Sequence, residues 1–200
     1  MKLPHKKSKG FTLVELLVVI AIIAVLAALS TPAIMKALQK AKIVKAKGIC
    51  TQFETAVNNF ENEYNYLPFG SGSVPDQDND PIRSDDDVVA VLAGVEKGGD
   101  KQNFKNIRFF ELGEPKGGSE ASYTDGMKVD KANGTAKIYD PWGETYYIVF
   151  DYDLDGQIEH PFDSTKEVGG KKAIMYSYGP DKEMEPGTLT GKNKDNPTNF

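Results

Sequence analysis

Residues 6–35 decide the fold of this chain, and they read K-K-S-K-G-F-T-L-V-E followed by L-L-V-V-I-A-I-I-A-V-L-A-A-L-S-T-P-A-I-M. The second part, residues 16–35, is a run of 20 residues without a charge. At about 1.5 Å of rise per residue, this run predicts a helix of roughly 30 Å, the thickness of the hydrocarbon core of a bilayer. We therefore expect a membrane-spanning helix near the start of the chain.

One acidic residue, Glu15, stands at the border of the apolar run. A carboxylate well inside a membrane segment costs about 2.5–3.5 kcal/mol on insertion scales, so Glu15 needs a partner. If the bond between Gly10 and Phe11 is cut, the new amino group of Phe11 lies four residues before Glu15, on the same helix face. An amino group created at Phe11 would therefore be a candidate partner for this acid.

The basic leader, the run G-F-T-L-V-E-L-L, the apolar block and Pro32 together resemble a type IV prepilin or a type II secretion pseudopilin. In that family a membrane peptidase cuts after the glycine and methylates the new N-terminal phenylalanine. The resemblance implies cleavage between Gly10 and Phe11, and it makes Glu15 the glutamate that serves assembly. The alternatives are an ordinary signal anchor with an incidental glutamate and a cleavable secretory signal, whose apolar core has only about 7–15 residues.

The resemblance also implies the partners and the location of the protein. The partners are further copies of the chain in a filament, a prepilin peptidase and methyltransferase, and the secretion or pilus assembly machinery of the inner membrane. The protein is expected in the bacterial inner membrane as a single-pass subunit, with its N-terminus cytoplasmic and its C-terminal domain in the periplasm, and then in the filament. The lysines leave this orientation open, because four precede the span and five follow it.

Composition sets limits on the function. The chain has 200 residues, 24 of them basic and 29 acidic, and 40% are hydrophobic, which suits one modest domain besides the span. Four lysines precede Gly10, so a processed chain has 20 basic residues and a net charge of −9. Such a field disfavours nucleic acid as a partner. Cys50 is the only cysteine, so no disulfide can form within one chain.

We expect an α+β, pilin-like fold, in which a long N-terminal helix packs on a small antiparallel sheet. Apolar residues recur every three or four positions from Ile49 to Tyr64, which predicts that the helix continues to about Tyr66, with a bend at Pro32. The expected parts are the leader (1–10), the membrane or filament-core half of the helix (11–35), its amphipathic half (36–67), variable loops with short helices (68–135), an antiparallel sheet with an Asp-rich loop (136–184) and a polar tail (185–200).

Within the variable part, residues 69–87 are expected to form a flexible acidic loop, and residues 88–92 a short helix capped by Ser84 or Asp85. Residues 104–112 form a second short apolar element. Residues 113–134 are polar and rich in glycine, so we expect an exposed excursion there.

The C-terminal part closes the domain. The D-P-W-G sequence at residues 140–143 predicts a turn, with Trp142 available for the core. Residues 145–152 are apolar on both faces, which predicts a central strand, and residues 173–178 predict a second strand before a turn at residues 178–181. This order resembles the core of major pseudopilins.

The loop after the central strand is a candidate calcium site. Asp151, Asp153 and Asp155, followed by a glycine, reproduce the first half of an EF-hand loop. The second half departs from that pattern, because Phe162 stands where a glutamate is needed; Asp181 could reach in from the next turn, or Glu159 and Asp163 could compensate. Major pseudopilins hold calcium near the loop that joins their last strands, so the resemblance also implies calcium.

Patterns for catalysis are nearly absent, and we do not expect an enzyme. His160 is the only histidine after the leader, and no G-x-S-x-G sequence occurs. The expected function is that of a structural subunit of a type II secretion pseudopilus, processed by prepilin peptidase and assembled into a helical filament that supports protein export. A type IV pilin of an adhesion, motility or DNA-uptake pilus is the first alternative, and a membrane-anchored binding or enzymatic domain is the remote one.

Overall fold

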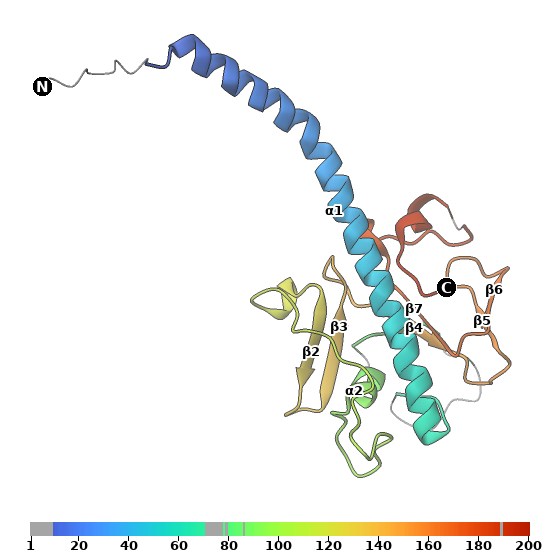
Figure 1. Ribbon diagram of the computed structural model, residues 1–200. Helices are drawn as coiled ribbons and strands as arrows, with labels where there is room; N and C mark the ends of the chain where they lie inside the picture. Colours follow the sequence, from blue (N-terminus) through green and yellow to red (C-terminus); the bar gives the residue numbers. More distant parts are fainter. Residues whose placement is uncertain (1–9, 71–77, 79, 86, 189) are drawn as a thin grey trace, which may run out of the picture. The chain divides into compact units, whose positions relative to one another are not determined.

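The computed structural model describes residues 10–70, 78, 80–85, 87–188 and 190–200. The chain divides into two compact units, Met1–Lys40 and Ala41–Phe200. The first unit holds the start of helix α1, and the second holds the rest of α1 with the described strands (Figure 1). Residues 1–9 of the expected leader and residues 71–77 of the expected acidic loop lie outside the described residues.

Helix α1 (Leu13–Tyr64) has 52 residues and continues through Pro32. Just before the proline, the hydroxyls of Ser30 and Thr31 each donate a hydrogen bond of 2.8 Å to a backbone carbonyl one turn earlier. The helix ends because Asn65 adopts a left-handed conformation with φ of 61°, a frequent way to cap a C-terminus. The predicted end near Tyr66 is therefore correct within two residues.

The second half of α1 supplies one wall of the core. Its buried residues recur at the spacing of one helix face: Ala46, Ile49, Cys50, Phe53, Ala56, Val57, Phe60 and Tyr64. The ring of Phe53 lies edge-on to Phe110 at 5.7 Å between centroids and 6.3 Å from the ring of Phe150. Burial of these large rings is the main source of stability that the helix brings to the domain.

A three-stranded antiparallel sheet packs on this helix. Its order is β1 (Ile82–Arg83), β4 (Tyr147–Phe150) and β7 (Ala173–Tyr176), with Ile148 of the middle strand opposite both Ile82 and Met175. The predicted central strand is confirmed, because β4 is paired on both sides. The expected α+β fold, a long helix on small antiparallel sheets, is confirmed as well (Figure 1).

Two antiparallel hairpins complete the strands. One joins β2 (Gly126–Asp130) to β3 (Thr135–Tyr139), and the other joins β5 (Gln157–Glu159) to β6 (Glu167–Gly169) within the loop that follows β4. The first hairpin corrects the expected exposed excursion at residues 113–134, because β2 lies inside it and Met127 is buried. Alternation along G-M-K-V-D and the Asn-Gly pair before β3 are the signals that the sequence offered for it.

Residues 104–112 have no regular secondary structure, although Phe110 is buried in the core. The short helix predicted at residues 88–92 is present as α2 (Asp87–Ala93). Residue 86, just before the helix, lies outside the described residues, so the prediction of Ser84 or Asp85 as the cap is not confirmed. The Ser84 hydroxyl instead donates to the carbonyl of Ile138 at 2.9 Å and accepts from the amide of Tyr146 at 2.9 Å, which joins β1, β3 and β4.

The polar tail is part of the domain. After the 3₁₀ turns η2 (Gly179–Asp181) and η3 (Gly191–Asp195), residues 197–199 run along the outer edge of β7. The amide of Ser177 donates to the carbonyl of Pro197 at 3.0 Å, and Thr198 forms an antiparallel bridge with Tyr176. The tail therefore covers backbone groups of an edge strand that would otherwise be open to pairing with another chain.

The side chain of Asn199 connects this tail to helix α1, so we expect its replacement to destabilise the domain. Its side chain accepts from the amide of Met175 at 2.9 Å and donates to Glu54 of α1 at 2.9 Å. We expect Asn199→Ala to lower the free energy of unfolding by about 1–3 kcal/mol, because partly buried partners lose their bonds. The measurement is urea unfolding of the full chain in detergent, followed by the fluorescence of Trp142, the only tryptophan. The exposed Lys194→Ala in the same tail is the control, and equal midpoints for the two variants would contradict the assignment.

Candidate functional site

Three aspartates converge beside the end of β4. Asp151 and Asp153 were expected to act together, and the structure adds Asp78, from the loop after α1. One carboxylate oxygen from each lies within 4.8 Å of the others. The amide of Tyr152 donates to Asp78 at 3.0 Å, which fixes this residue against the end of the strand. The sequence could not indicate Asp78, because 73 positions separate it from Asp151.

The other two predicted ligands are placed differently. Asp155 accepts from the amide of Gln157 at 2.7 Å, and its own amide donates to Asp153 at 3.1 Å, so it shapes the turn next to the three carboxylates. Asp181 lies in η2 and accepts from the amide of Glu183 at 3.1 Å. Among the described residues, the group of converging ligand atoms includes neither of these two.

The carboxylate of Asp151 is the most constrained member of the group. Its residue is 3% exposed, one oxygen accepts from the amide of Gly156 at 3.1 Å, and the other is buried without a hydrogen bond in the described part of the chain. Burial raises the pKa of Asp151, and the nearby charges of Asp153 and Asp155 raise it further. Burial also raises the pKa of Asp78. A buried oxygen beside two more carboxylates is what a hard divalent cation binds.

The N-terminal end of α1 carries a reciprocal cap. The amide and the hydroxyl of Thr12 donate to the Glu15 carboxylate at 2.8 and 2.7 Å, and the amide of Glu15 donates to the Thr12 hydroxyl at 3.2 Å. This is the capping box expected of a T-x-x-E sequence. Gly10 and Phe11 precede the helix and are exposed, so the bond between them lies outside regular structure.

The first half of α1 is apolar around its whole circumference. Its side chains from Leu13 to Met35 are largely exposed, with Leu16 at 55% and Leu29 at 74%. By length and composition, α1 is the one helix among the described residues that could cross a membrane. A helix that is hydrophobic all round must be buried by something other than its own chain.

Comparison with known proteins identifies the same end of the chain. Residues 5–31 match the family model of the prokaryotic N-terminal methylation motif. The match supports a type IV pilin-like prepilin. Processing by a prepilin peptidase and assembly into a filament are general properties of proteins with this motif. Neither the curated proteins nor the solved structures contain a match to the chain.

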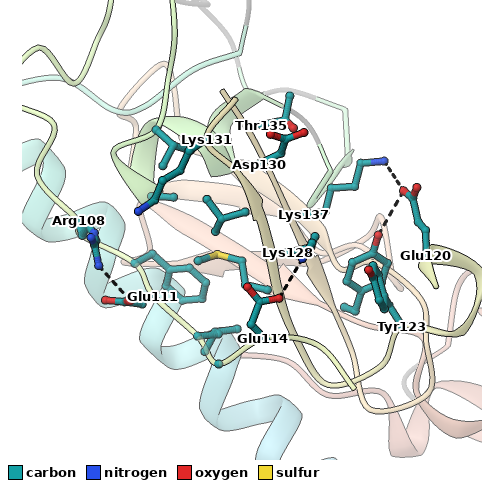
Figure 2. A pocket seen from close by; sticks show the side chains of 18 residues that line it. Arg108, Glu111, Glu114, Glu120, Tyr123, Lys128, Asp130, Lys131, Thr135 and Lys137 are labelled. Carbon is teal, nitrogen blue, oxygen red and sulfur yellow. Dashed lines mark hydrogen bonds and ion pairs between the residues drawn. The ribbon is translucent and has the colours of Figure 1, made fainter. Parts of the chain in front are cut away.

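The chain also has a groove beside the β2–β3 hairpin (Figure 2). Phe110, Met127 and Val129 line it together with charged side chains at its rim. Most of these charges form ion pairs with one another (Figure 2). The pairs are Arg108 with Glu111 at 3.2 Å, Lys128 with Glu114 at 3.1 Å and Lys137 with Glu120 at 2.8 Å. The rim therefore offers no excess of one charge with which to select a ligand.

The residues considered for catalysis have structural surroundings. His160 is half-buried, its Nδ1 accepts from the amide of Phe162 at 3.2 Å, and its ring lies edge-on to Phe200. Burial lowers the pKa of His160 and raises that of the Cys50 thiol, which is fully buried in α1. The methylation motif suggests a structural, non-enzymatic subunit.

Because the pKa of Asp78 is raised, we expect this residue to make the free energy of unfolding depend on pH. A carboxyl whose pKa is higher in the folded state than in the unfolded state lowers stability above that pKa, and the loss disappears as the pH falls through it. In a chelator at pH 7, we expect Asp78→Asn to be more stable than the wild type, because the amide still accepts from Tyr152 without the charge. The advantage should vanish at a pH below the folded pKa of Asp78.

Asp163→Asn is the control of opposite sign. Hydrogen bonds from Thr165 and the ammonium of Lys166 lower the pKa of Asp163 to about 2, so its charge stabilises the folded state at neutral pH. This variant should be less stable than the wild type at pH 7. Urea midpoints from pH 4 to pH 7 measure both, and a loss of stability in Asp78→Asn at pH 7 would contradict the repulsion.

Proposed function

We propose that this protein is a structural subunit of a type II secretion pseudopilus. In this proposal it waits in the inner membrane with its C-terminal domain in the periplasm, loses its leader after Gly10, is methylated at Phe11 and joins a helical filament that supports protein export. One observation supports assembly into a filament: the apolar first half of α1 is exposed on all sides. Outside the bilayer, a bundle of identical helices buries this surface.

The choice of a pseudopilus is supported by how two turns meet. The D-P-W-G turn and the turn after β7 resemble those of major pseudopilins, and the two are joined through Asp140. This buried carboxylate accepts from the Ser177 hydroxyl at 2.6 Å and from the amide of Trp142 at 2.8 Å. The Ser177 hydroxyl in turn accepts from the amide of Gly179 at 3.0 Å.

Deletion of the gene tests the choice. We expect a deletion strain to retain exported proteins within the cell envelope and to keep its surface pili and twitching motility. Plasmid-borne wild-type protein should restore export. Normal export together with lost pili, adhesion or DNA uptake would instead favour a type IV pilin. A soluble domain that turns over a substrate, in a chain that works without Glu15, would favour an anchored enzyme.

Assembly depends on Glu15 in this proposal. The amino group of a processed Phe11 in one subunit pairs with the Glu15 carboxylate of its neighbour, and both charges leave water together. In the free chain Glu15 is bound by Thr12, so the neighbour's ammonium would approach a carboxylate that is already oriented.

Two variants of Glu15 separate pairing from capping. Glu15→Leu should insert into the membrane at least as well as the wild type, because it removes a penalty of about 2.5–3.5 kcal/mol, and should assemble poorly. Glu15→Gln keeps an acceptor for Thr12 but no charge, so it should also fail to assemble. Filament yield by electron microscopy and insertion by alkaline extraction are the measurements. If Glu15→Gln assembles normally, the glutamate acts through the cap alone.

We also propose that the aspartate group holds calcium. Asp78, Asp151 and Asp153 supply the converging oxygens, and the buried Asp151 oxygen that has no hydrogen bond among the described residues fits a cation ligand. The bound ion would neutralise the repulsion within the group and tie the loop after α1 to the end of β4. Calcium suits this donor set because it accepts carboxylates in flexible geometry.

Removal of the metal tests this site. Millimolar calcium should raise the melting temperature of the full chain above its value in chelator, by an amount that corresponds to about 2.7 kcal/mol at a hundredfold excess over Kd. Asp153→Ala should abolish the shift. Asp181→Ala is the matched control and should keep it, because Asp181 is bonded within its own turn. A shift lost in Asp181→Ala and kept in Asp153→Ala would overturn the proposed ligand set.

A further inference from the structure

Helix α1 carries five lysines directly after its apolar half: Lys36, Lys40, Lys42, Lys45 and Lys47. Lys45 pairs with Asp125 at 2.6 Å, at the start of the β2–β3 hairpin. The other four are exposed, and none of them has an ion pair in the part of the chain that the structure describes. Four cations on one short stretch of helix therefore face solvent without a counter-charge.

The acids in the C-terminal part of the same helix do not pair with these lysines. Glu54 binds Lys171 through both carboxylate oxygens, at 2.7 and 2.8 Å. Glu61 pairs with Lys172 and Glu63 with Lys105, so lysines from other segments neutralise the acidic end of α1. The free lysines thus need anions from outside the subunit, and Glu54, Glu61 and Glu63, which a neighbouring copy of this helix would also present, are already paired.

The distance of each lysine from the apolar run decides which anions it meets. At about 1.5 Å per residue, Lys36, Lys40 and Lys42 lie within about 10 Å of Met35, the last residue of the run. The headgroup layer of a bilayer extends roughly 5–8 Å beyond the hydrocarbon core, and charges act over about 10 Å at 0.1 M salt. Lys47 lies about 18 Å beyond the run, outside both ranges.

We propose that Lys36, Lys40 and Lys42, the lysine collar, bind the phosphate groups of anionic phospholipids where α1 leaves the bilayer. Each ammonium is a compact charge on a flexible stem and can follow a mobile headgroup. The contacts hold the subunit at a fixed depth before assembly, and they must be released when it leaves the membrane for the filament. This inference rests on the proposed function, because it requires α1 to lie in a bilayer.

Lipid selectivity of the reconstituted full chain tests the collar. The protein is placed in phosphatidylcholine vesicles with a trace of spin-labelled phosphatidylglycerol or phosphatidylcholine, and electron paramagnetic resonance measures the fraction of each label held at the protein. A lysine near an anionic surface contributes about a fivefold preference, so we expect the wild type to favour phosphatidylglycerol at least about fivefold. In 1 M salt the preference should fall toward onefold, because the screening length shrinks to about 3 Å.

Charge-neutral variants locate the effect. The triple variant Lys36→Gln/Lys40→Gln/Lys42→Gln should show no preference between the two lipids, whereas Lys47→Gln should match the wild type. An unchanged preference in the triple variant, or an equal loss in Lys47→Gln, overturns the collar. The collar is also overturned if the triple variant keeps its lipid preference and loses filament yield, because the lysines then form contacts between copies.

Alkaline extraction of the same vesicles separates this inference from the proposed function. If the wild type is washed off at high pH, α1 is not inserted, and the membrane anchor and the collar both fail. If the wild type resists extraction but shows no preference for phosphatidylglycerol, the anchor stands and the collar alone is overturned.

Discussion

The removal of one apolar surface from water is the constraint on which this molecule depends. The first half of α1 is hydrophobic on every side, and nothing among the described residues covers it. The chain can therefore exist only with that half in lipid or among other apolar helices. A bilayer and a helical bundle solve the same problem, so under the proposed function one helix would serve first as an anchor and then as the core of a filament.

The second half of the same helix solves a different problem, because it builds a domain that remains in water. It buries one face, with Phe53 and Phe60 fully enclosed, and leaves a polar face for ion pairs with distant segments. Glu54 shows how far these contacts reach, since it joins Lys171 before β7 to Asn199 in the tail. A single ion pair at the surface adds little to the stability of the domain. Several ion pairs with partners far along the chain, however, specify which segments pack against the helix.

The sequence predicted best what depends on local pattern. The long helix follows from apolar spacing, and the central strand β4 from its apolar run. It failed where the local pattern is weak and a partner segment decides the structure. The strand β2 was missed because a short strand in a polar, glycine-rich stretch is stabilised by its partner and by burial of Met127. Asp78 joined the aspartate group through folding of the loop after α1, which no spacing in the sequence encodes.

Closure of the C-terminal region relies on polar contacts, because the chain has a single cysteine and that thiol is buried in α1. Asp140 links the turn after β3 to Ser177 after β7, the tail hydrogen-bonds along the edge of β7, and the aspartate group gathers the loop after α1. A disulfide would make this closure depend on redox state, whereas carboxylates make it depend on pH and, under the calcium proposal, on divalent cations. If the proposed calcium site is occupied, the stability of the domain is coupled to the ionic composition of its surroundings.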